Sequence, residues 1–240
     1  PDGYTILMAP VSPLAINPAL YAGKMTFNPE RDFTPLTLVA KVPLVLVAHP
    51  SVPAPNLKAL IALAKSRPGR LSYGSAGSGS SNHLIGEMFK AAAGLNIVHI
   101  PYKGGAPAMV ALMSGEVDLV VGQVPSVLTQ VKAHRVRALG VSGAKRSPAL
   151  PDVPTMIESG LAGFDATSWY AVVGPAGLPK NITDRLHAEL IKAINSPEVR
   201  GRLADEGADI ETTTPTELVA FVKSEVEKWA KAVKVSGATV

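Results

Sequence analysis

The chain has 240 residues, of which 47% are hydrophobic and 18% charged, so it is long enough for one large domain or two modest ones with a true core. Its formal net charge of +4 comes from scattered cations without a basic run, which does not indicate nucleic-acid binding. The absence of cysteine excludes disulfides and thiolate metal sites, and no apolar stretch reaches the roughly 18 residues of a membrane span.

Strands and helices are predicted to alternate through the middle of the chain. In chain order we expect a buried strand at residues 4–8, a loop at 9–13, a helix at 13–21, strands at 37–40 and 44–48, a helix at 57–66, a strand at 71–73, a helix at 83–93, a strand at 97–100, a helix at 107–114, strands at 117–121, 136–141 and 169–173, and helices at 181–195, 197–206 and 217–235. The alternation predicts parallel βαβ units. Because the C-terminal part is almost all helix, the strands it covers must come from earlier in the chain, which indicates a domain built from separate segments.

The most informative segment is a glycine- and serine-rich loop that joins a predicted strand to a predicted helix. Its glycines permit positive φ angles, so successive backbone N–H groups can converge on an anion, and the following helix N-terminus adds unpaired donors. Its serine hydroxyls can donate as well. The loop therefore predicts a carboxylate site without a charged side chain. The candidate ligand-binding residues in it are Ser75, Ala76, Gly77, Ser78, Gly79, Ser80, Ser81 and His83.

Two nucleotide-binding interpretations of this loop fail on their own chemistry. A Walker A loop needs a lysine that is absent, and a dinucleotide fingerprint needs a third glycine where Asn82 stands and an acidic residue at the end of the next strand. Two structural interpretations stay open. The loop can be a flexible linker, and His83 can cap the helix instead of contacting a ligand.

A second loop, at residues 101–107, also precedes a helix. Tyr102 can donate a hydrogen bond there, and Lys103 is either a cation for the ligand or a solvated side chain. The histidines have no metal-site spacing, and neither a hydrolase elbow nor a paired set of carboxylates is visible. We therefore expect no metal, no cofactor and no enzymatic activity. Trp169 is expected to fill a core rather than line a cleft.

Several runs of residues resemble one family, the tripartite tricarboxylate transporter receptors, also called the Bordetella uptake gene (Bug) family. The resemblance covers essentially the whole chain. It is carried by the runs at residues 1–7, 16–21, 73–77, 83–89, 98–104, 113–118, 137–141, 151–155 and 174–179, together with Ser12.

The resemblance implies an α/β, two-lobed periplasmic binding protein of the Venus-flytrap type II class, with a mainly parallel sheet flanked by helices in each lobe. Residues 1–43 with 174–240 would form the first lobe and residues 44–173 the second, with strands 44–48 and 169–173 crossing between them. The first lobe would be incomplete, because a glycine-rich loop that follows the first strand in the family would precede residue 1. A signal peptide would have been removed with that segment.

The function that the resemblance implies is a periplasmic receptor that captures a small carboxylate in the interlobe cleft for a tripartite tricarboxylate transporter. The ligand would be a di- or tricarboxylate, an amino acid or an aromatic acid. Ser12 would contribute from the first lobe, and Gln123 stands where family members often carry an acidic residue. We expect a monomer with membrane transporter subunits as partners and no nucleic acid. The alternatives are an accessory protein of a sensor kinase and an α/β enzyme acting on a carboxylate.

Overall fold

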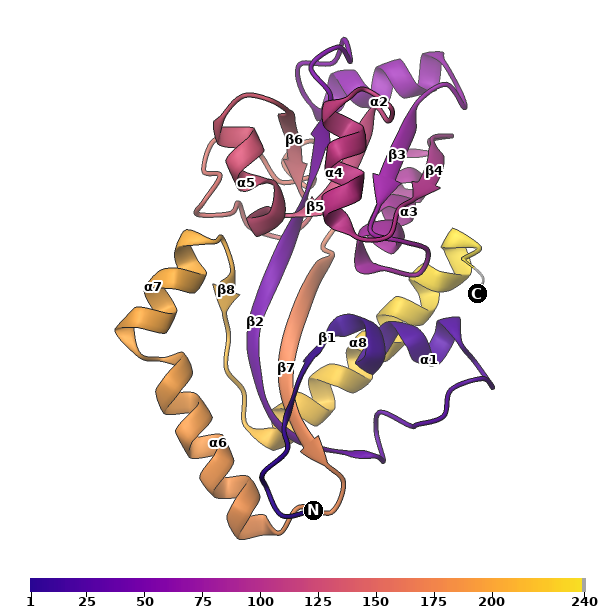
Figure 1. The fold of residues 1–240 in the computed structure, drawn as a ribbon. Coiled ribbons are helices and arrows are strands. Elements are labelled where there is room, and N and C mark those ends of the chain that lie inside the picture. The colour runs from indigo at the N-terminus through magenta and orange to yellow at the C-terminus, as the bar shows by residue number, and fades with distance from the viewer. Residues whose placement is uncertain (239–240) are drawn as a thin grey trace. The chain divides into compact units, whose positions relative to one another are not determined.

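The structure is a computed structural model in which residues 1–238 are described. The chain packs as two compact units, and neither is a single continuous segment (Figure 1). Unit 1 contains Pro1–Lys41, Ser168–Asp205 and the chain from Asp209 on, whereas unit 2 contains Val42–Thr167 and Glu206–Ala208. The two main boundaries expected from the sequence were after residues 43 and 173.

The strands are β1 (Leu7–Pro10), β2 (Phe33–Ala48), β3 (Ser72–Ser75), β4 (Val98–Pro101), β5 (Leu119–Gln123), β6 (Arg137–Val141), β7 (Thr167–Pro175) and β8 (Asp209–Ile210). The helices are the π-helix η1 (Ser12–Ile16), α1 (Asn17–Leu20), α2 (Leu57–Ser66), α3 (Ser81–Ala93), α4 (Gly105–Met113), α5 (Val124–Lys132), α6 (Lys180–Ile194), α7 (Pro197–Asp205) and α8 (Pro215–Ser236).

The sheet of unit 2 is mixed. β3 lies between β4 and β5 and is parallel to both, while the C-terminal part of β2 is antiparallel to β5 and to β6. The parallel pairs arise because α3 connects β3 to β4 and α4 connects β4 to β5, and such crossovers return the chain in the same direction. The carboxyl ends of β3, β4 and β5 therefore lie at one edge of this sheet.

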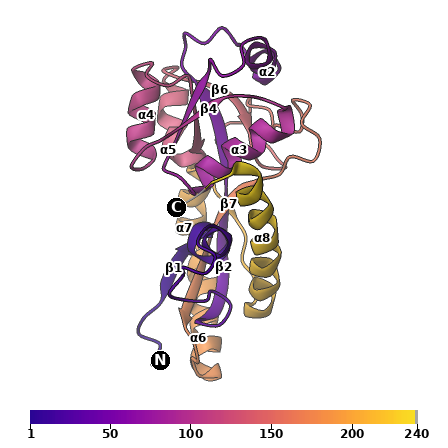
Figure 2. The same cartoon turned by 90° about the vertical axis from the view of Figure 1, so that its right-hand side faces the viewer.

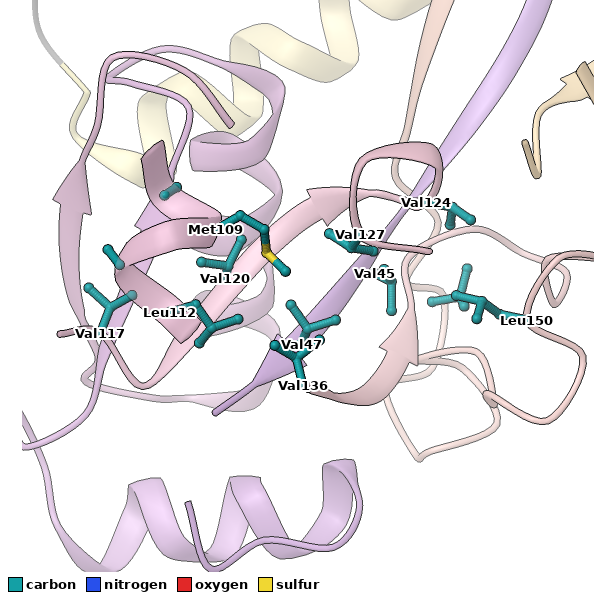
Figure 3. Close-up of a cluster of buried hydrophobic side chains, with 13 residues drawn as sticks. Val45, Val47, Met109, Leu112, Val117, Val120, Val124, Val127, Val136 and Leu150 are labelled. Carbon is teal, nitrogen blue, oxygen red and sulfur yellow. The ribbon is translucent and has the colours of Figure 1, made fainter. Parts of the chain in front are cut away.

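Aliphatic side chains fill the core of unit 2 (Figure 3). Helices α4 and α5 cover one face of the sheet and α3 covers the other (Figure 2). Because both faces are covered, every residue from Leu44 to Ala48 is buried. The core cluster on the α4–α5 side consists of Val45, Val47, Ala108, Met109, Ala111, Leu112, Val117, Val120, Val124, Val127, Val136, Val141 and Leu150.

Unit 1 is also α/β, with α8 packed against η1 and α1. The α/β class is confirmed, but the expectation of a mainly parallel sheet is wrong for this unit, because β1 pairs antiparallel with β7 and β2 pairs antiparallel with β8. The chain runs from β1 through η1 and α1 to β2, but β7 lies between β1 and β2 in the sheet. This helical connection therefore does not join two neighbouring strands, as it would in a parallel βαβ unit.

Local predictions succeeded where capping signals are strong. The helix at Leu57–Ser66 has the predicted bounds, and Gly94 ends α3 in the left-handed conformation with φ 64°. The predicted strand at residues 4–8 is displaced to β1, and Tyr4 is 93% exposed rather than buried. The strands predicted at 37–40 and 44–48 are one continuous strand through Pro43.

Helix α5 and strand β8 were not predicted. Pro125 at the start of α5 resembles a helix breaker in the sequence, although the first turn of a helix tolerates proline. Strand β8 has only two residues, and its pairing with Ala40 and Lys41 is a long-range contact without a local signal.

Candidate functional site

The predicted site residues of unit 2 gather at the carboxyl edge of its three parallel strands. The β3–α3 loop follows β3, Tyr102 follows β4, and Gln123 is the last residue of β5. The backbone N–H of Tyr102 donates to the carbonyl oxygen of Ser75 at 3.1 Å, which joins the first two of these loops. Helices α3, α4 and α5 all begin at this edge, where ligands of open α/β sheets usually bind.

The β3–α3 loop turns sharply at two glycines. Gly77 and Gly79 have φ angles of +128° and +75°, and a Cβ on Gly77 would lie 3.3 Å from the carbonyl oxygen of Tyr102. Ser80 then caps α3, since its Oγ accepts from the backbone N–H of His83 at 3.2 Å and donates to the carbonyl oxygen of Gly77 at 2.7 Å. The glycines and the cap together set the path of the loop.

The glycine amides of this loop are occupied within the loop itself. The Gly77 amide donates to Ser75 Oγ at 3.2 Å, and the Gly79 amide donates to His83 Nδ1 at 3.1 Å. This corrects the expectation that the glycine amides would converge on an anion. Within residues 76–82, the backbone amides that make no hydrogen bond are those of Ala76, Ser78, Ser81 and Asn82.

A buried polar network supports the loop from β3, α3 and β4. Ser75 Oγ lies 2.7 Å from Nε2 of His99, and the ring of His99 stacks on that of His83 with centroids 3.9 Å apart and planes inclined by 13°. On the next turn of α3, Glu87 Oε1 accepts from the hydroxyl of Tyr73 and from Nζ of Lys90, each at 2.7 Å. The network thus connects the loop to the centre of α3.

Both stacked histidines are neutral at physiological pH. Burial, with a smaller contribution from the neighbouring His83, lowers the pKa of His99 to about 4. Burial also lowers the pKa of His83, against the opposing attraction of Glu87. Because the Gly79 amide occupies Nδ1 of His83, the proton of this neutral ring is on Nε2.

The structure assigns supporting positions to two of the predicted ligand-binding residues. Ser75 has no exposed surface and His83 is 5% exposed, and the polar groups of both are engaged inside the protein. Ser78 is exposed and Ala76 and Gly77 are half-buried, so the tip of the loop is the part that a solute can reach. Ser81 is buried in the first turn of α3.

The remaining predicted residues differ in their surroundings. The hydroxyl of Tyr102 donates to Glu116 Oε1 at 2.9 Å, and Lys103 is exposed. Gln123 is half-buried, pairs with Leu44 in the sheet and precedes α5. Ser12 is half-buried at the start of η1 and belongs to unit 1, so it is described separately from the loop.

Sequence reasoning missed the residues that hold the loop from below. Asn82 Nδ2 donates to the carbonyl oxygen of Val121 at 2.8 Å, which links α3 to β5. From the sequence, His99 was considered only as a possible metal ligand. A signal was present in the spacing of His83, Glu87 and Lys90, which places three polar side chains on one face of α3. The prediction for Trp169 is confirmed, since it is fully buried in unit 1.

The chemistry available at this edge is binding by neutral donors. The pair of Ser75 and His99 has the distance of a nucleophile and a base, but no surface of Ser75 is accessible, so a substrate cannot reach its hydroxyl in this conformation. Among residues 1–238 no group of three or more potential metal ligands is found. In the same range, no helix combines the length and apolar character of a membrane crossing.

Comparison with known proteins identifies the family of this chain. Residues 1–237 match the family described as tripartite tricarboxylate transporter family receptor, TctC. The chain belongs to the TctC family. Among curated relatives, BugT of Bordetella pertussis is 37% identical to this chain, and the match covers 99% of this chain and 73% of BugT.

Solved structures of similar proteins share the fold of this TctC-family chain. Rpa4515 of R. palustris, solved with adipate, is 34% identical with a TM-score of 0.91, covering 99% of this chain and 79% of that one. The periplasmic binding protein BugD is 36% identical with a TM-score of 0.88, covering 100% and 80%. MatC of Rhodopseudomonas palustris, with bound malate, is 29% identical with a TM-score of 0.85, covering 97% and 80%.

Proposed function

We propose that this TctC-family protein is a periplasmic solute-binding receptor that captures a small carboxylate with its β3–α3 loop and delivers it to a tripartite tricarboxylate transporter. The observation that carries the proposal is the set of amides at Ala76, Ser78, Ser81 and Asn82 that make no hydrogen bond among residues 1–238. Amides at a loop and a helix N-terminus bind carboxylates through aligned N–H dipoles.

The charge of the loop supports a carboxylate held by neutral groups. No lysine or arginine occurs between Tyr73 and Glu87, and Lys103 of the next loop is exposed. A carboxylate bound in this way is recognised by the direction of its oxygen lone pairs rather than by an opposite charge. Since similar proteins were solved with adipate and with malate, we propose a dicarboxylate as the first ligand class to test.

The proposed activity is binding without turnover. The only nucleophile–base geometry found among the described residues of the site is that of Ser75 and His99, and the inaccessible hydroxyl of Ser75 favours a structural role. A receptor needs only to hold its ligand and release it unchanged.

The test is a ligand screen by thermal melting and calorimetric titration with adipate, malate, citrate, glutamate and benzoate. Adipamide is the matched neutral control, because it has the length of adipate without its charges. We expect at least one carboxylate at about 100 times its Kd to raise the melting temperature by about 5–10 °C, and adipamide to have no effect. Equal stabilisation by adipamide, or conversion of the ligand seen by NMR, would contradict the proposal.

Delivery to a transporter is tested in cells. Uptake of the best radiolabelled ligand is compared between the source organism and a strain that lacks this gene, and the gene product is located by cell fractionation. We expect uptake to be lost in the deletion strain and the protein to be found in the periplasmic fraction. Unchanged uptake would contradict the transport role and favour a sensing role.

A further inference from the structure

His99 lies outside the candidate loop and yet contacts its base. It belongs to β4, where it pairs in register with Tyr73 of β3, and the two rings have centroids 4.9 Å apart. Its Nε2 is hydrogen-bonded to Ser75 Oγ at 2.7 Å, and its ring stacks on that of His83 with centroids 3.9 Å apart. One imidazole thus touches the end of β3 and the first turn of α3.

These contacts hold the loop at two points. Ser75 Oγ accepts from the Gly77 amide at 3.2 Å, and His83 Nδ1 accepts from the Gly79 amide at 3.1 Å. The two tethered amides flank Ser78, whose own amide makes no hydrogen bond among residues 1–238. The stacked histidines therefore decide which amides of the loop stay available to a solute.

Protonation of the stacked pair is unfavourable in this arrangement. A proton on Nδ1 of His83 would replace the lone pair that accepts from Gly79. Two charged rings stacked at 3.9 Å would repel each other. The ionisable groups facing the pair are Tyr73 of β3 and Glu87 and Lys90 of α3, and the single carboxylate among them already accepts from the other two.

We propose that His99 is a positioning residue for carboxylate capture. Protonation of the stacked His83–His99 pair weakens the hydrogen bonds that hold the Gly77 and Gly79 amides, here called the tethers, and so weakens ligand binding at acidic pH. The inference rests on the proposed function for its ligand, but the state of the loop can be measured without one. In the neutral state the tethers keep the loop preorganised, which lowers the cost of binding.

The first measurement is amide hydrogen exchange at Gly77 and Gly79, followed by NMR at one pH without ligand. The variant His99→Phe keeps a ring for stacking and removes the nitrogen that contacts Ser75. The matched control is His49→Phe, since His49 is also half-buried in unit 2 and its Nδ1 is hydrogen-bonded to Ser51 Oγ at 2.6 Å, away from the loop. We expect exchange at both glycines to accelerate about tenfold in His99→Phe, as loss of one net hydrogen bond predicts, and to be unchanged in His49→Phe.

The second measurement is the Kd for adipate by calorimetry between pH 7.5 and pH 4, because the pKa of His99 is about 4. We expect His99→Phe to bind about tenfold more weakly than wild type at pH 7.5, and the ratio of the two Kd values to fall towards one only as the pH approaches 4. Titration of adipate itself is common to both proteins and cancels in this ratio. If adipate does not bind wild type, malate is the probe, and failure of every probe contradicts the proposed function while the exchange data still decide the role of His99.

Unchanged exchange at Gly77 and Gly79 in a folded His99→Phe protein would overturn the positioning role. A Kd ratio that is constant with pH would overturn the pH dependence. Should His99→Phe not fold, His99→Gln replaces it. Glutamine keeps a polar group near Ser75 but removes the ring that stacks on His83, so unchanged exchange at Gly79 in that variant would contradict the proposal.

Discussion

The backbone amide of Gly79 donates a hydrogen bond to Nδ1 of His83 at 3.1 Å, four residues further along the chain. The contact closes the tip of the β3–α3 loop onto the first turn of α3. Gly79 is buried, so water is a poor alternative partner for its amide. A side chain that the sequence offers as a ligand contact therefore shapes the loop.

Replacing His83 by phenylalanine should destabilise the protein, because it removes this contact. The ring can still stack on His99, but the buried amide of Gly79 loses its acceptor. An unsatisfied buried donor costs about 1–3 kcal/mol, so the free energy of unfolding should fall by that amount. Urea unfolding measures it, and an unchanged free energy of unfolding with an unchanged slope would show that Gly79 finds another partner.

The neutral histidine pair makes stability depend on pH. Burial lowers the pKa of His99 in the folded state to about 4 from an ordinary value of 6.5. Between these pH values the unfolded chain binds a proton that the folded protein does not, so the free energy of unfolding should fall as the pH is lowered below 6.5. Urea unfolding at several pH values is the measurement, with His99→Phe as the control. If the variant loses stability as steeply as wild type, the dependence comes from other groups.

A carboxylate placed in the loop should compete with the ligand. In Gly77→Asp the new side chain lies beside the amides of Ala76 and Ser78 and repels an incoming carboxylate, which costs several kcal/mol and hence about a thousandfold in affinity. Gly160→Asp is the matched control, because Gly160 also has a positive φ, +104°, with no atom within 4 Å of an added Cβ. Calorimetric titration with the best ligand compares the two proteins. Equal affinity in both would remove the loop from the binding site.

Unit 1 contains its own buried polar centre. Glu225 Oε2 accepts from Nε1 of Trp169 at 2.7 Å and from Nε1 of Trp229 at 2.8 Å. Glu225→Leu would leave two buried indole donors unpaired, so we expect the free energy of unfolding to fall by about 2–5 kcal/mol. Glu227→Leu, on an exposed face of the same helix, should change it by less than about 0.5 kcal/mol. Similar values for the two variants would contradict a structural role for Glu225.

A stabilising change is expected at the end of α5. His134 has φ +53° and is the one residue other than glycine with a positive φ among residues 1–238. Its amide and that of Arg135 donate to the carbonyl oxygens of Val131 and Gln130, each at 3.0 Å, as in a Schellman cap. Glycine adopts this conformation without steric cost, so His134→Gly should raise the free energy of unfolding by about 0.5–1 kcal/mol, and His134→Ala should not. Chemical denaturation distinguishes the two, and a loss in His134→Gly would show that the histidine side chain itself stabilises the fold.

Local rules of chain geometry made much of this protein readable from its sequence. The bounds of Leu57–Ser66, the left-handed Gly94 and the glycine turns at Gly77 and Gly79 follow from interactions among residues a few positions apart. For the same reason the sequence was sufficient to place the loop at a strand-to-helix junction. The family resemblance was also readable, because the residues that carry it lie along the whole chain.

The pairing of distant segments was decided only in three dimensions. The strand register sets Tyr73 opposite His99, and this register depends on how α3 packs over the sheet, which no local pattern encodes. That packing brings His99 into contact with Ser75 and His83. Ser75 and His83, which were predicted to contact the ligand, therefore support the loop instead. The antiparallel pairings of β1 with β7 and of β2 with β8 also join residues that are far apart in the sequence. Hydrophobic alternation predicts that a segment is a strand, but it does not predict which strand pairs with it.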